Sequence, residues 1–353
     1  MEYIALKNIC KINMGQSPDS SSYNDNKDGI PFFQGNADFG EKYPVTRVWC
    51  NAPIKVAQPN DILISVRAPI GALNFAKEEC CIGRGLAALT PDRSKVSLEF
   101  IYWVLKWKKA ELNSKGTGST FKAISRKVLE ETLVPAIDFE KQYEYAEILG
   151  KTYSVIKKYK KELNCLDGLI KARFVEMFGD PVSNSYGFPE ATLPELGELG
   201  RGVSKHRPRN DSKLLGGDYP LIQTGDVANA GLYITSYGGT YSELGLKQSK
   251  MWNKGTLCIT IAANIAKTAI LEFDACFPDS VVGFIANEKT NNIFIHYWFS
   301  FFQAILESQA PESAQKNINL KILSELKVIV PKKEKQDEFV EFIEQVYKSK
   351  VTV

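Results

Sequence analysis

Ile30-Pro31-Phe32-Phe33-Gln34 recurs in the second half of the chain as Tyr219-Pro220-Leu221-Ile222-Gln223. Solenoid repeats run to only about 50 residues, whereas this offset is near 190 residues. We therefore expect two copies of one domain, each with its own core and the same strand order, performing similar tasks on a ligand with two parts. The other matched stretches are Phe100–Trp103 with Phe294–Tyr297, Ser119–Ser125 with Ser313–Asn319, Leu133–Pro135 with Ile329–Pro331, and Glu140–Gln142 with Glu334–Gln336.

The composition is that of a globular protein of two or three domains, with 353 residues, 44% hydrophobic and 24% charged. The most apolar run, Ile293–Leu306, contains His296, Ser300 and Gln303, which favours a buried helix over a membrane span. The N-terminus lacks the pattern of a secretion signal. Seven cysteines without a Cys-x-x-Cys motif argue against a disulfide framework or a zinc site, so we expect a cytoplasmic protein.

The net charge of +3 says little about partners. Residues 1–135 hold 18 Lys and Arg against 14 Asp and Glu, and residues 182–331 hold 13 against 14. Neither copy is polybasic, so a DNA ligand would have to be bound by a local basic surface rather than by bulk charge.

Each copy has the same predicted order of elements, which indicates an α+β domain with a mixed or antiparallel sheet. A short helical opening leads into a Gly/Ser/Pro-rich loop, short strands, one aromatic-rich helix, a polar loop, and a strand that ends in proline. The landmarks in the two copies are the loops from Gly15 and Gly202, the strands Asp61–Val66 and Thr256–Ile261, and helices near 97–112 and 291–307.

The segment from Asp138 to Met177 has no proline and carries apolar residues seven apart, which predicts a long helix that packs along another helix. Its 40 or so residues would span roughly 60 Å. A second such helix is predicted from Pro331 to the end of the sequence, about half as long. The apolar positions are Leu149, Ile156, Leu163, Ile170 and Met177 in the first helix, and Phe339, Ile343 and Val346 in the second.

Because the second helix is short, about half of the first stripe would lack a partner helix within the chain. We expect its far end, around Ile170, Phe174 and Met177, to be covered by a second copy of the chain or by another subunit.

Motifs of nucleotide and methyl-donor chemistry are absent. The sequence has no P-loop, no Gly-x-Ser-x-Gly, no His-Glu-x-x-His and no Asn-Pro-Pro-aromatic motif. His296 lies in an apolar helix and is expected to have a core or interface role, whereas His206, in a Lys-His-Arg loop, is a candidate phosphate contact. We therefore predict no catalytic residues and no metal site.

Leu163–Pro181 closely resembles the end of the central conserved helix in specificity subunits of type I restriction-modification enzymes. The turns Gln34-Gly35-Asn36 and Gln223-Thr224-Gly225-Asp226 are similar to a strand-loop element in each target recognition domain of that family. Asp61–Ser65 and the Val-Pro segments before the long helices are also similar. The resemblance covers the whole chain, and its helix-end motif is the most specific part.

The resemblance implies two similar α/β target recognition domains, joined and separated by long antiparallel coiled-coil helices with pseudo-two-fold symmetry. The corresponding ranges are 1–137 for the first domain, 138–180 for the central spacer helix, 181–331 for the second domain and 332–353 for the C-terminal spacer helix. In the family the second helix is usually as long as the first, whereas here some 20 residues of it would be missing.

The family also implies a function in which this chain is not a catalyst. It would be the DNA-recognition subunit that reads a bipartite target in double-stranded DNA, one domain per half-site, and docks two methyltransferase subunits and restriction subunits. No cofactor is expected in this chain; S-adenosylmethionine, ATP and magnesium would belong to the partner subunits. Self-association through the unpaired helix is a further expected contact, and no membrane is involved.

Candidate DNA contacts are polar residues in loops, because base edges and phosphates are read by side chains with donors and acceptors. Several of these residues could equally satisfy turn backbone or face solvent; Arg67 and Arg84, in Gly/Pro-containing loops, are expected to point outward. The candidates are Gln16, Ser17, Gln34, Asn36, Arg67, Arg84, Ser119, Thr120 and Lys122 in the first copy, and Lys205, Arg207, Gln223, Asp226, Asn264, Lys267, Ser313, Gln315 and Lys316 in the second.

Two other functions are compatible with the sequence. One is an orphan or regulatory DNA-binding protein that has no methyltransferase partner, which copurification would distinguish. The other is a standalone nuclease that acts through lone carboxylates, which incubation with DNA and a divalent metal would reveal.

Overall fold

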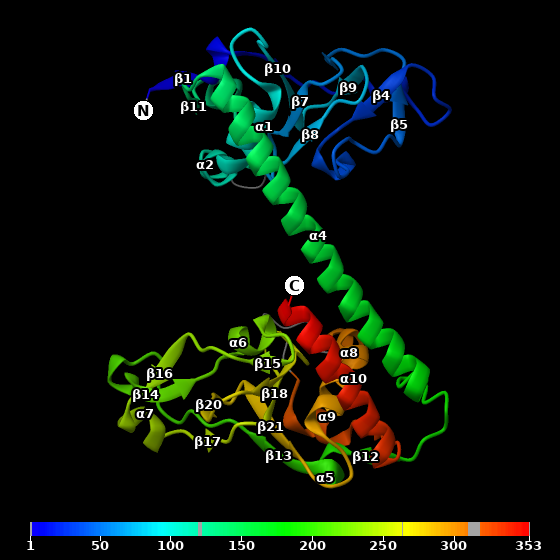
Figure 1. The fold of residues 1–353 in the computed structure, drawn as a ribbon, viewed down its shortest axis with the longest axis vertical. Helices are drawn as coiled ribbons and strands as arrows, with labels where there is room; N and C mark the ends of the chain where they lie inside the picture. Colours follow the sequence, from blue (N-terminus) through cyan, green and yellow to red (C-terminus); the bar gives the residue numbers. More distant parts are fainter. Residues whose placement is uncertain (1, 119–121, 263, 310–317, 353) are drawn as a thin grey trace. The chain divides into compact units, whose positions relative to one another are not determined.

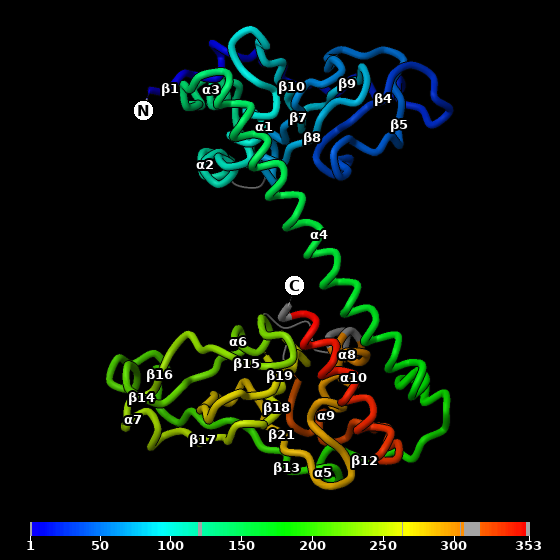
Figure 2. The backbone as a smooth tube through the Cα atoms, viewed as in Figure 1, coloured from blue at the N-terminus to red at the C-terminus, as the bar shows by residue number. Residues whose placement is uncertain are grey.

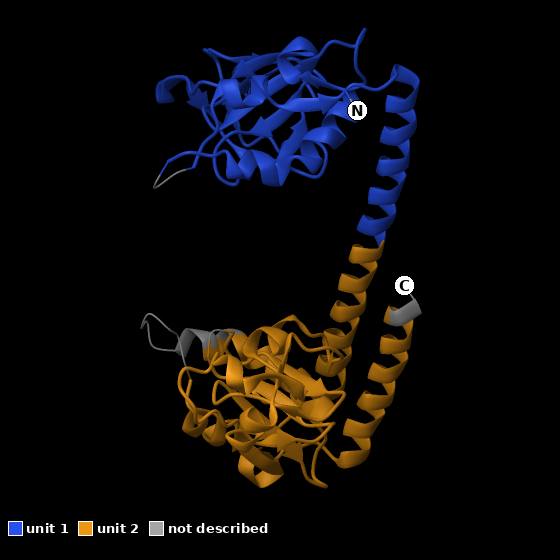
Figure 3. Cartoon of the chain, turned by 90° about the vertical axis from the view of Figure 1, so that its left-hand side faces the viewer, with its two compact units in different colours: residues 1–158 blue, residues 159–353 orange. Residues whose placement is uncertain are grey.

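The structure is a computed structural model that describes residues 2–118, 122–262, 264–309 and 318–352. The chain divides into two compact units, which Figure 3 colours separately: unit 1 is Met1–Lys158 and unit 2 is Tyr159–Val353. The long helix predicted between the two copies is present as α4 (Phe139–Phe178; Figure 2). Its first part belongs to unit 1 and its last part belongs to unit 2 (Figure 3).

Unit 1 is an α+β structure in which short strands form three sheets (Figure 1). Its strands are β1 (Tyr3–Ala5), β2 (Cys10–Met14), β3 (Tyr23–Asn24), β4 (Ile30–Phe33), β5 (Val48–Cys50), β6 (Val56–Ala57), β7 (Ile62–Ser65), β8 (Leu73–Phe75), β9 (Cys80–Ile82), β10 (Leu86–Pro91) and β11 (Leu133–Pro135). Its helices are α1 (Leu98–Trp107), α2 (Lys109–Ser114), α3 (Arg126–Glu130) and the start of α4, with 3-10 turns at Leu6–Asn8, Ser20–Ser22 and Asn36–Asp38.

The core of unit 1 has a helix layer, a central sheet and a second sheet. The central sheet has the order β2-β10-β7-β8, and all its pairs are antiparallel. Ile62 and Ile64 pack in one core cluster with α1, whereas Leu63 packs in another with Phe33 and Ile82 of the second sheet. This alternation follows from the two-residue period of a strand and explains why the three consecutive residues Ile62, Leu63 and Ile64 are all apolar: both faces of β7 are covered.

Unit 2 is built from the same kinds of element. Its strands are β12 (Glu190–Thr192), β13 (Gly197–Arg201), β14 (Leu215–Leu221), β15 (Tyr233–Ile234), β16 (Gly239–Tyr241), β17 (Met251–Trp252), β18 (Leu257–Thr260), β19 (Thr268–Leu271), β20 (Ala275–Cys276), β21 (Val281–Ala286) and β22 (Lys327–Ile329). Its helices are the end of α4, α5 (Leu193–Leu196), α6 (Thr224–Asn229), α7 (Glu243–Lys247), α8 (Asn292–Gln309), α9 (Leu320–Glu325) and α10 (Lys333–Thr352), with a 3-10 turn at Ser212–Leu214.

The two units share their strand order, as the repeated sequence predicts. The order β2-β10-β7-β8 in unit 1 corresponds to β13-β21-β18-β19 in unit 2, and β5-β4-β9-β6 corresponds to β16-β14-β20-β17. The pairs β4–β9 and β14–β20 are both parallel within otherwise antiparallel sheets. Each unit is therefore a mixed α+β domain, and each carries one extra edge strand, β3 or β15.

A buried glutamine ties each long helix to its own unit. Gln142 in α4 accepts a hydrogen bond from the Ser97 N–H at 2.8 Å and donates one to the Ile137 carbonyl at 2.9 Å. Gln336 in α10 accepts one from the Thr290 hydroxyl at 2.9 Å and donates to the Pro331 carbonyl at 2.9 Å. The repeated Glu-Lys-Gln motif thus marks the joint between an aromatic-rich helix, α1 or α8, and a long helix.

Within unit 2, α4 and α10 run antiparallel. Arg173 contacts Glu338 near the start of α10, and the earlier Asp167 pairs with Lys350 near its end. The helices lie side by side in Figures 1 and 3.

The expectation that the far end of the α4 stripe lacks a partner within the chain is wrong. Ile170, Phe174 and Met177 are 1%, 0% and 8% exposed, in the core of unit 2. The Phe174 ring packs against Phe294 of α8 and Phe339 of α10, with centroids 5.5 and 5.4 Å apart. A heptad stripe does not say whether a helix or a domain core covers it, and here both do.

The part of α4 that remains open is its middle. Six large apolar side chains exposed there lie toward one face of the helix: Tyr145, Ile148, Leu149, Val155, Ile156 and Tyr159, each between 44% and 53% exposed. We call these six residues the open stripe of α4. Leu149 and Ile156 were predicted as helix-packing positions, and in this chain no described residue buries them.

Two smaller expectations need adjustment. The aromatic helix expected at 97–112 is two helices, α1 and α2, which meet at Lys108. The apolar run Ile293–Leu306 is part of α8, which covers the unit 2 sheet, and no helix in the described ranges is long and apolar enough to cross a membrane.

Replacing Phe174 by Ala should destabilise unit 2 by about 3–5 kcal/mol, because it removes a fully buried ring and leaves a cavity. The neighbouring change Val175→Ala, at a position 41% exposed, should cost less than about 1 kcal/mol. Urea unfolding of both variants measures the difference; equal midpoints would contradict this account of the α4 core.

Candidate nucleic-acid interface

Three loops of unit 1 meet at Ser17, which brings together four predicted residues. The Gln34 amide donates to the Ser17 hydroxyl at 2.9 Å, and the Arg84 backbone N–H donates to the same hydroxyl at 3.2 Å. Gln16, next to Ser17, and Arg84 both expose their side chains. A Cβ at Gly83 would lie 2.5 Å from the Gln34 amide oxygen, so a larger residue there would displace the Gln34 side chain from this position.

The turn after Gln34 has a structural role as well. The Asp38 carboxylate accepts hydrogen bonds from the Gln34 N–H at 2.9 Å and the Gly35 N–H at 3.4 Å. Asn36 lies in this turn and is half-buried. The backbone of the turn is therefore satisfied by Asp38, while the Gln34 side chain is held at the surface by Ser17.

Arg67 and Lys122 form a second group. Their segments are joined by a bridge between Arg67 and Ala123 and by a hydrogen bond from the Ala68 N–H to the Lys122 carbonyl at 3.0 Å. Both side chains are exposed. Ser119 and Thr120 of the same loop lie outside the described residues.

The turn of unit 2 that follows β14 repeats the arrangement at Gln34 with one difference. The Gln223 N–H donates to the Asp226 carboxylate at 2.8 Å, so Asp226 caps α6, as Asp38 caps its turn. Ser204 takes the place of Ser17, but its buried hydroxyl has no hydrogen-bond partner among the described residues. The Gln223 side chain is exposed at a pocket of about 290 Å³ that Arg209 and other loop residues also line.

The basic run of unit 2 is partly neutralised. Arg207 donates to the Ser204 carbonyl at 2.6 Å and lies 3.5 Å from the Asp279 carboxylate, which also pairs with Arg209. Arg201 donates to the Asp279 carbonyl at 2.5 Å. Arg201 and Arg209 were not among the predicted contacts. Both belong to the same basic run as Arg207, which could have pointed to them. The sequence does not show that the distant Asp279 contacts this run. Lys205 is exposed.

The β7–β8 and β18–β19 hairpins show that Arg67 and Lys267 are not at matched positions. The Ser65 N–H bonds the Ala72 carbonyl at 2.9 Å, and the Thr260 N–H bonds the Lys267 carbonyl at 2.9 Å. Lys267 therefore corresponds to Ala72. Asn264 is exposed at the tip of its hairpin, whereas Lys267 is half-buried and lines a different cavity. Ser313, Gln315 and Lys316 lie outside the described residues.

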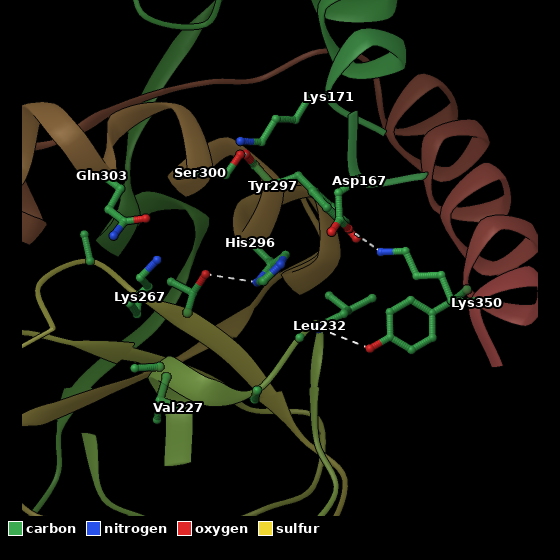
Figure 4. Close-up of a pocket in the computed structure, with 16 residues that line it drawn as sticks. Asp167, Lys171, Val227, Leu232, Lys267, His296, Tyr297, Ser300, Gln303 and Lys350 are labelled. Carbon is green, nitrogen blue, oxygen red and sulfur yellow. Dashed lines mark hydrogen bonds and ion pairs between the residues drawn. The ribbon is translucent and has the colours of Figure 1, made fainter. Parts of the chain in front are cut away.

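The two histidines have unlike surroundings. His206 is exposed, with its Nε2 atom 3.2 Å from the Asp211 carboxylate. His296 in α8 is half-buried, and its Nδ1 atom lies 3.0 Å from the Thr268 hydroxyl (Figure 4). Burial, together with the charge of Lys350, lowers the pKa of His296 from 6.5 to about 4. His296 is therefore neutral near pH 7, as a half-buried histidine without a carboxylate partner should be.

No cluster of three or more His, Cys, Asp or Glu side chains in the described part of the chain is arranged to hold a metal ion. The loops described above instead carry amide, hydroxyl, guanidinium and ammonium groups at the ends of strands.

The family model of the type I restriction modification DNA specificity domain matches residues 1–165 and again residues 190–353. The chain belongs to this family, and each match corresponds to one copy of the repeated domain.

Named relatives include proteins of two organisms. A protein of Methanocaldococcus jannaschii, named as a predicted MjaX specificity subunit of a type I restriction enzyme, is 44% identical over 152 residues, which are 43% of this chain and 36% of that protein. This chain therefore matches about a third of that relative's length. The EcoBI specificity subunit of Escherichia coli is 22% identical over 381 residues, covering 98% of this chain and 78% of the relative.

The fold is also found in a solved structure. The crystal structure of a type I restriction-modification system S subunit from M. genitalium matches 99% of this chain and 92% of its own, with a TM-score of 0.59 and 16% identity. At this identity the match concerns the fold alone.

The lowered pKa of His296 should make stability depend on pH. Between pH 6.5 and about 4 the unfolded chain binds a proton that the folded protein does not, so folding should lose up to about 3 kcal/mol as the pH falls through this range. The His296→Tyr variant carries the residue type of the matched position Tyr102 and should lose less folding free energy over the same pH range. Urea unfolding at both pH values measures this; the same loss in both proteins would contradict it.

Proposed function

We propose that this chain is the DNA-recognition subunit of a type I restriction-modification complex. It reads a bipartite target in double-stranded DNA, one unit for each half-site, and performs no catalysis of its own. Methyltransferase and restriction subunits would supply the chemistry, with S-adenosylmethionine, ATP and magnesium. The observation that carries the proposal is the double match of the DNA specificity family model, once to each unit.

The loops support this function in physical terms. In unit 1 the amide of Gln34 and the guanidinium groups of Arg67 and Arg84 are exposed on neighbouring strand-end loops. Amide and guanidinium groups make the bidentate contacts that distinguish bases in the major groove. In unit 2 the comparable groups are the Gln223 amide and Arg209, which line one pocket. Exposed Gln16, Lys122 and Lys205 fit phosphate contacts, which fix the register.

The ranges that follow from this function are 1–137 and 181–331 for the target recognition domains and 138–180 and 332–353 for the spacer helices. We infer that these helices form an antiparallel coiled coil with pseudo-two-fold symmetry. The salt bridges of Arg173 and Lys350, which join α4 to α10 in antiparallel order, support this.

The open stripe of α4 is the surface on which we place the partner subunits. Six large apolar side chains that are about half exposed along one helix form a patch that proteins usually cover. Two methyltransferase subunits are the occupants that fit the function, and a second copy of the chain is the alternative occupant.

Arg67→Ala should weaken binding to the target duplex. If the guanidinium reads a base, preference at one position should relax by about 1–3 kcal/mol; if it contacts phosphate, the loss should be uniform and the salt dependence shallower. The control is Arg93→Ala, because Arg93 is exposed after the far end of β10 and away from these loops. Fluorescence anisotropy at several salt concentrations measures both variants; equal affinities would remove Arg67 from the interface.

Lengthening α4 should widen the gap between the half-sites. The insertion belongs after Lys160, between the contact of Lys157 with Glu41 in unit 1 and that of Asp167 with Lys350 in unit 2. Four residues add about 6 Å of helix, or nearly two base pairs. Sequencing of selected DNA should show both half-sites unchanged and a wider gap.

The control for this insertion replaces residues 160–162 by alanine and keeps the helix length, so its gap should stay the same. An unchanged gap in the insertion variant, with binding retained, would refute α4 as the spacer.

A further inference from the structure

Unit 2 contains a cavity of about 480 Å³ that the proposed DNA recognition does not use. Its walls come from five parts of the unit: the end of α4, the α6–β15 segment, the β18–β19 hairpin, α8 and α10 (Figure 4). A volume of this size lies within the range of small-molecule sites.

The matched place in unit 1 is filled by its own side chains. There the ammonium of Lys106 lies 3.4 Å from the centroid of the Tyr153 ring and 5.0 Å from that of Trp103. The Tyr102 ring stacks on Phe75, with centroids 4.8 Å apart. In unit 1 this position is therefore filled by four aromatic rings, those of Phe75, Tyr102, Trp103 and Tyr153, and by the Lys106 ammonium group.

Smaller residues open the position in unit 2. At the offset of 194 residues that relates Phe100–Trp103 to Phe294–Tyr297, Ser300 stands where unit 1 has Lys106, and His296 stands where it has Tyr102. Tyr297 and Tyr347 replace Trp103 and Tyr153 and still line the space. The cavity therefore results from particular side-chain differences between two copies of one fold rather than from loose packing.

The charge of the cavity is positive. Asp167 pairs with Lys350, so these two charges offset each other. Lys171 and Lys267 also line the cavity, and neither has an ion-pair partner among the described residues. Figure 4 shows both amino groups directed into the space beside His296 and Gln303. Two ammonium groups without carboxylate partners attract an anion.

The remaining walls of the cavity are suited to contact the apolar part of an organic ligand. Val227, Leu232 and the rings of Tyr297 and Tyr347 provide apolar surface, and the Ser300 hydroxyl is already used because it donates to the Tyr297 carbonyl at 2.6 Å. A phosphate group has enough acceptor oxygens to bind both ammonium groups together.

We propose that this cavity of unit 2 binds a phosphate ester, with its phosphate between Lys171 and Lys267 and its organic part against Tyr297 and Tyr347. The ester is either a free small molecule or a backbone phosphate of nucleic acid, since both present the same group.

Isothermal titration calorimetry of the full chain tests the site with adenosine 5′-monophosphate, inorganic phosphate and adenosine as probes. The monophosphate should bind most tightly, phosphate more weakly and adenosine least. Lys267→Met should weaken the monophosphate by about tenfold, because it removes one charge-assisted contact. Ser300→Met, which has the length of the Lys106 side chain without its charge, should fill the cavity and weaken binding at least as much.

The matched control is Lys335→Met, since Lys335 is exposed on α10 and does not line the cavity; its affinity should equal that of the unaltered chain. Competition by a duplex without the target sequence would identify the source as a nucleic-acid backbone, and its absence would identify a free ester. No binding of the monophosphate at millimolar concentration, or equal binding by the Ser300→Met and Lys335→Met variants, would overturn the proposal. Target-duplex binding, measured separately, reports on DNA recognition whatever the cavity does.

Discussion

The joint between each long helix and its unit depends on one buried glutamine. Gln142 and Gln336 are 3% and 0% exposed, and each is bonded both to the start of an aromatic helix and to the chain just before its own helix. A buried amide that loses its partners costs about 1–3 kcal/mol per unpaired group. Because the same amide both donates and accepts, the glutamine fixes the start of each long helix against its unit.

Around this joint, unit 2 concentrates aromatic packing where α4 ends. Phe174 and Phe178 lie against Phe294 of α8 and Phe339 of α10, so the end of α4 belongs to the core of unit 2. Leu149 and Ile156, earlier in the same helix, remain exposed. One helix thus has a part that folds with unit 2 and a part available to other chains, and this division is what the proposed spacer function needs.

Much of the fold could be predicted from the sequence because the same pattern of residues occurs twice in the chain. Matched landmarks such as Gln142 and Gln336 led to two domains with one strand order and to a long helix between them. The covered end of α4 could not be predicted, because a heptad stripe looks the same whether a helix or a domain core packs on it. Only the structure shows that Phe294 of α8 packs against Phe174.

The candidate site was predictable only in part. Ser17 and Gln34 were both chosen as polar loop residues, but their contact depends on how three loops meet at Gly83. Arg67 and Lys267 were both chosen as basic loop residues, whereas the hydrogen bonds of the hairpins show that Lys267 corresponds to Ala72. Register is set by backbone pairing, which a single sequence does not reveal.

The most direct test of DNA recognition by two matched units is the methylated motif in DNA from cells that carry this chain with its methyltransferase partner. The account predicts two short specific half-sites separated by a fixed number of unspecified base pairs, and exchanging unit 1 for that of a relative should change one half-site alone. A single continuous motif, or a change in both half-sites after that exchange, would contradict it.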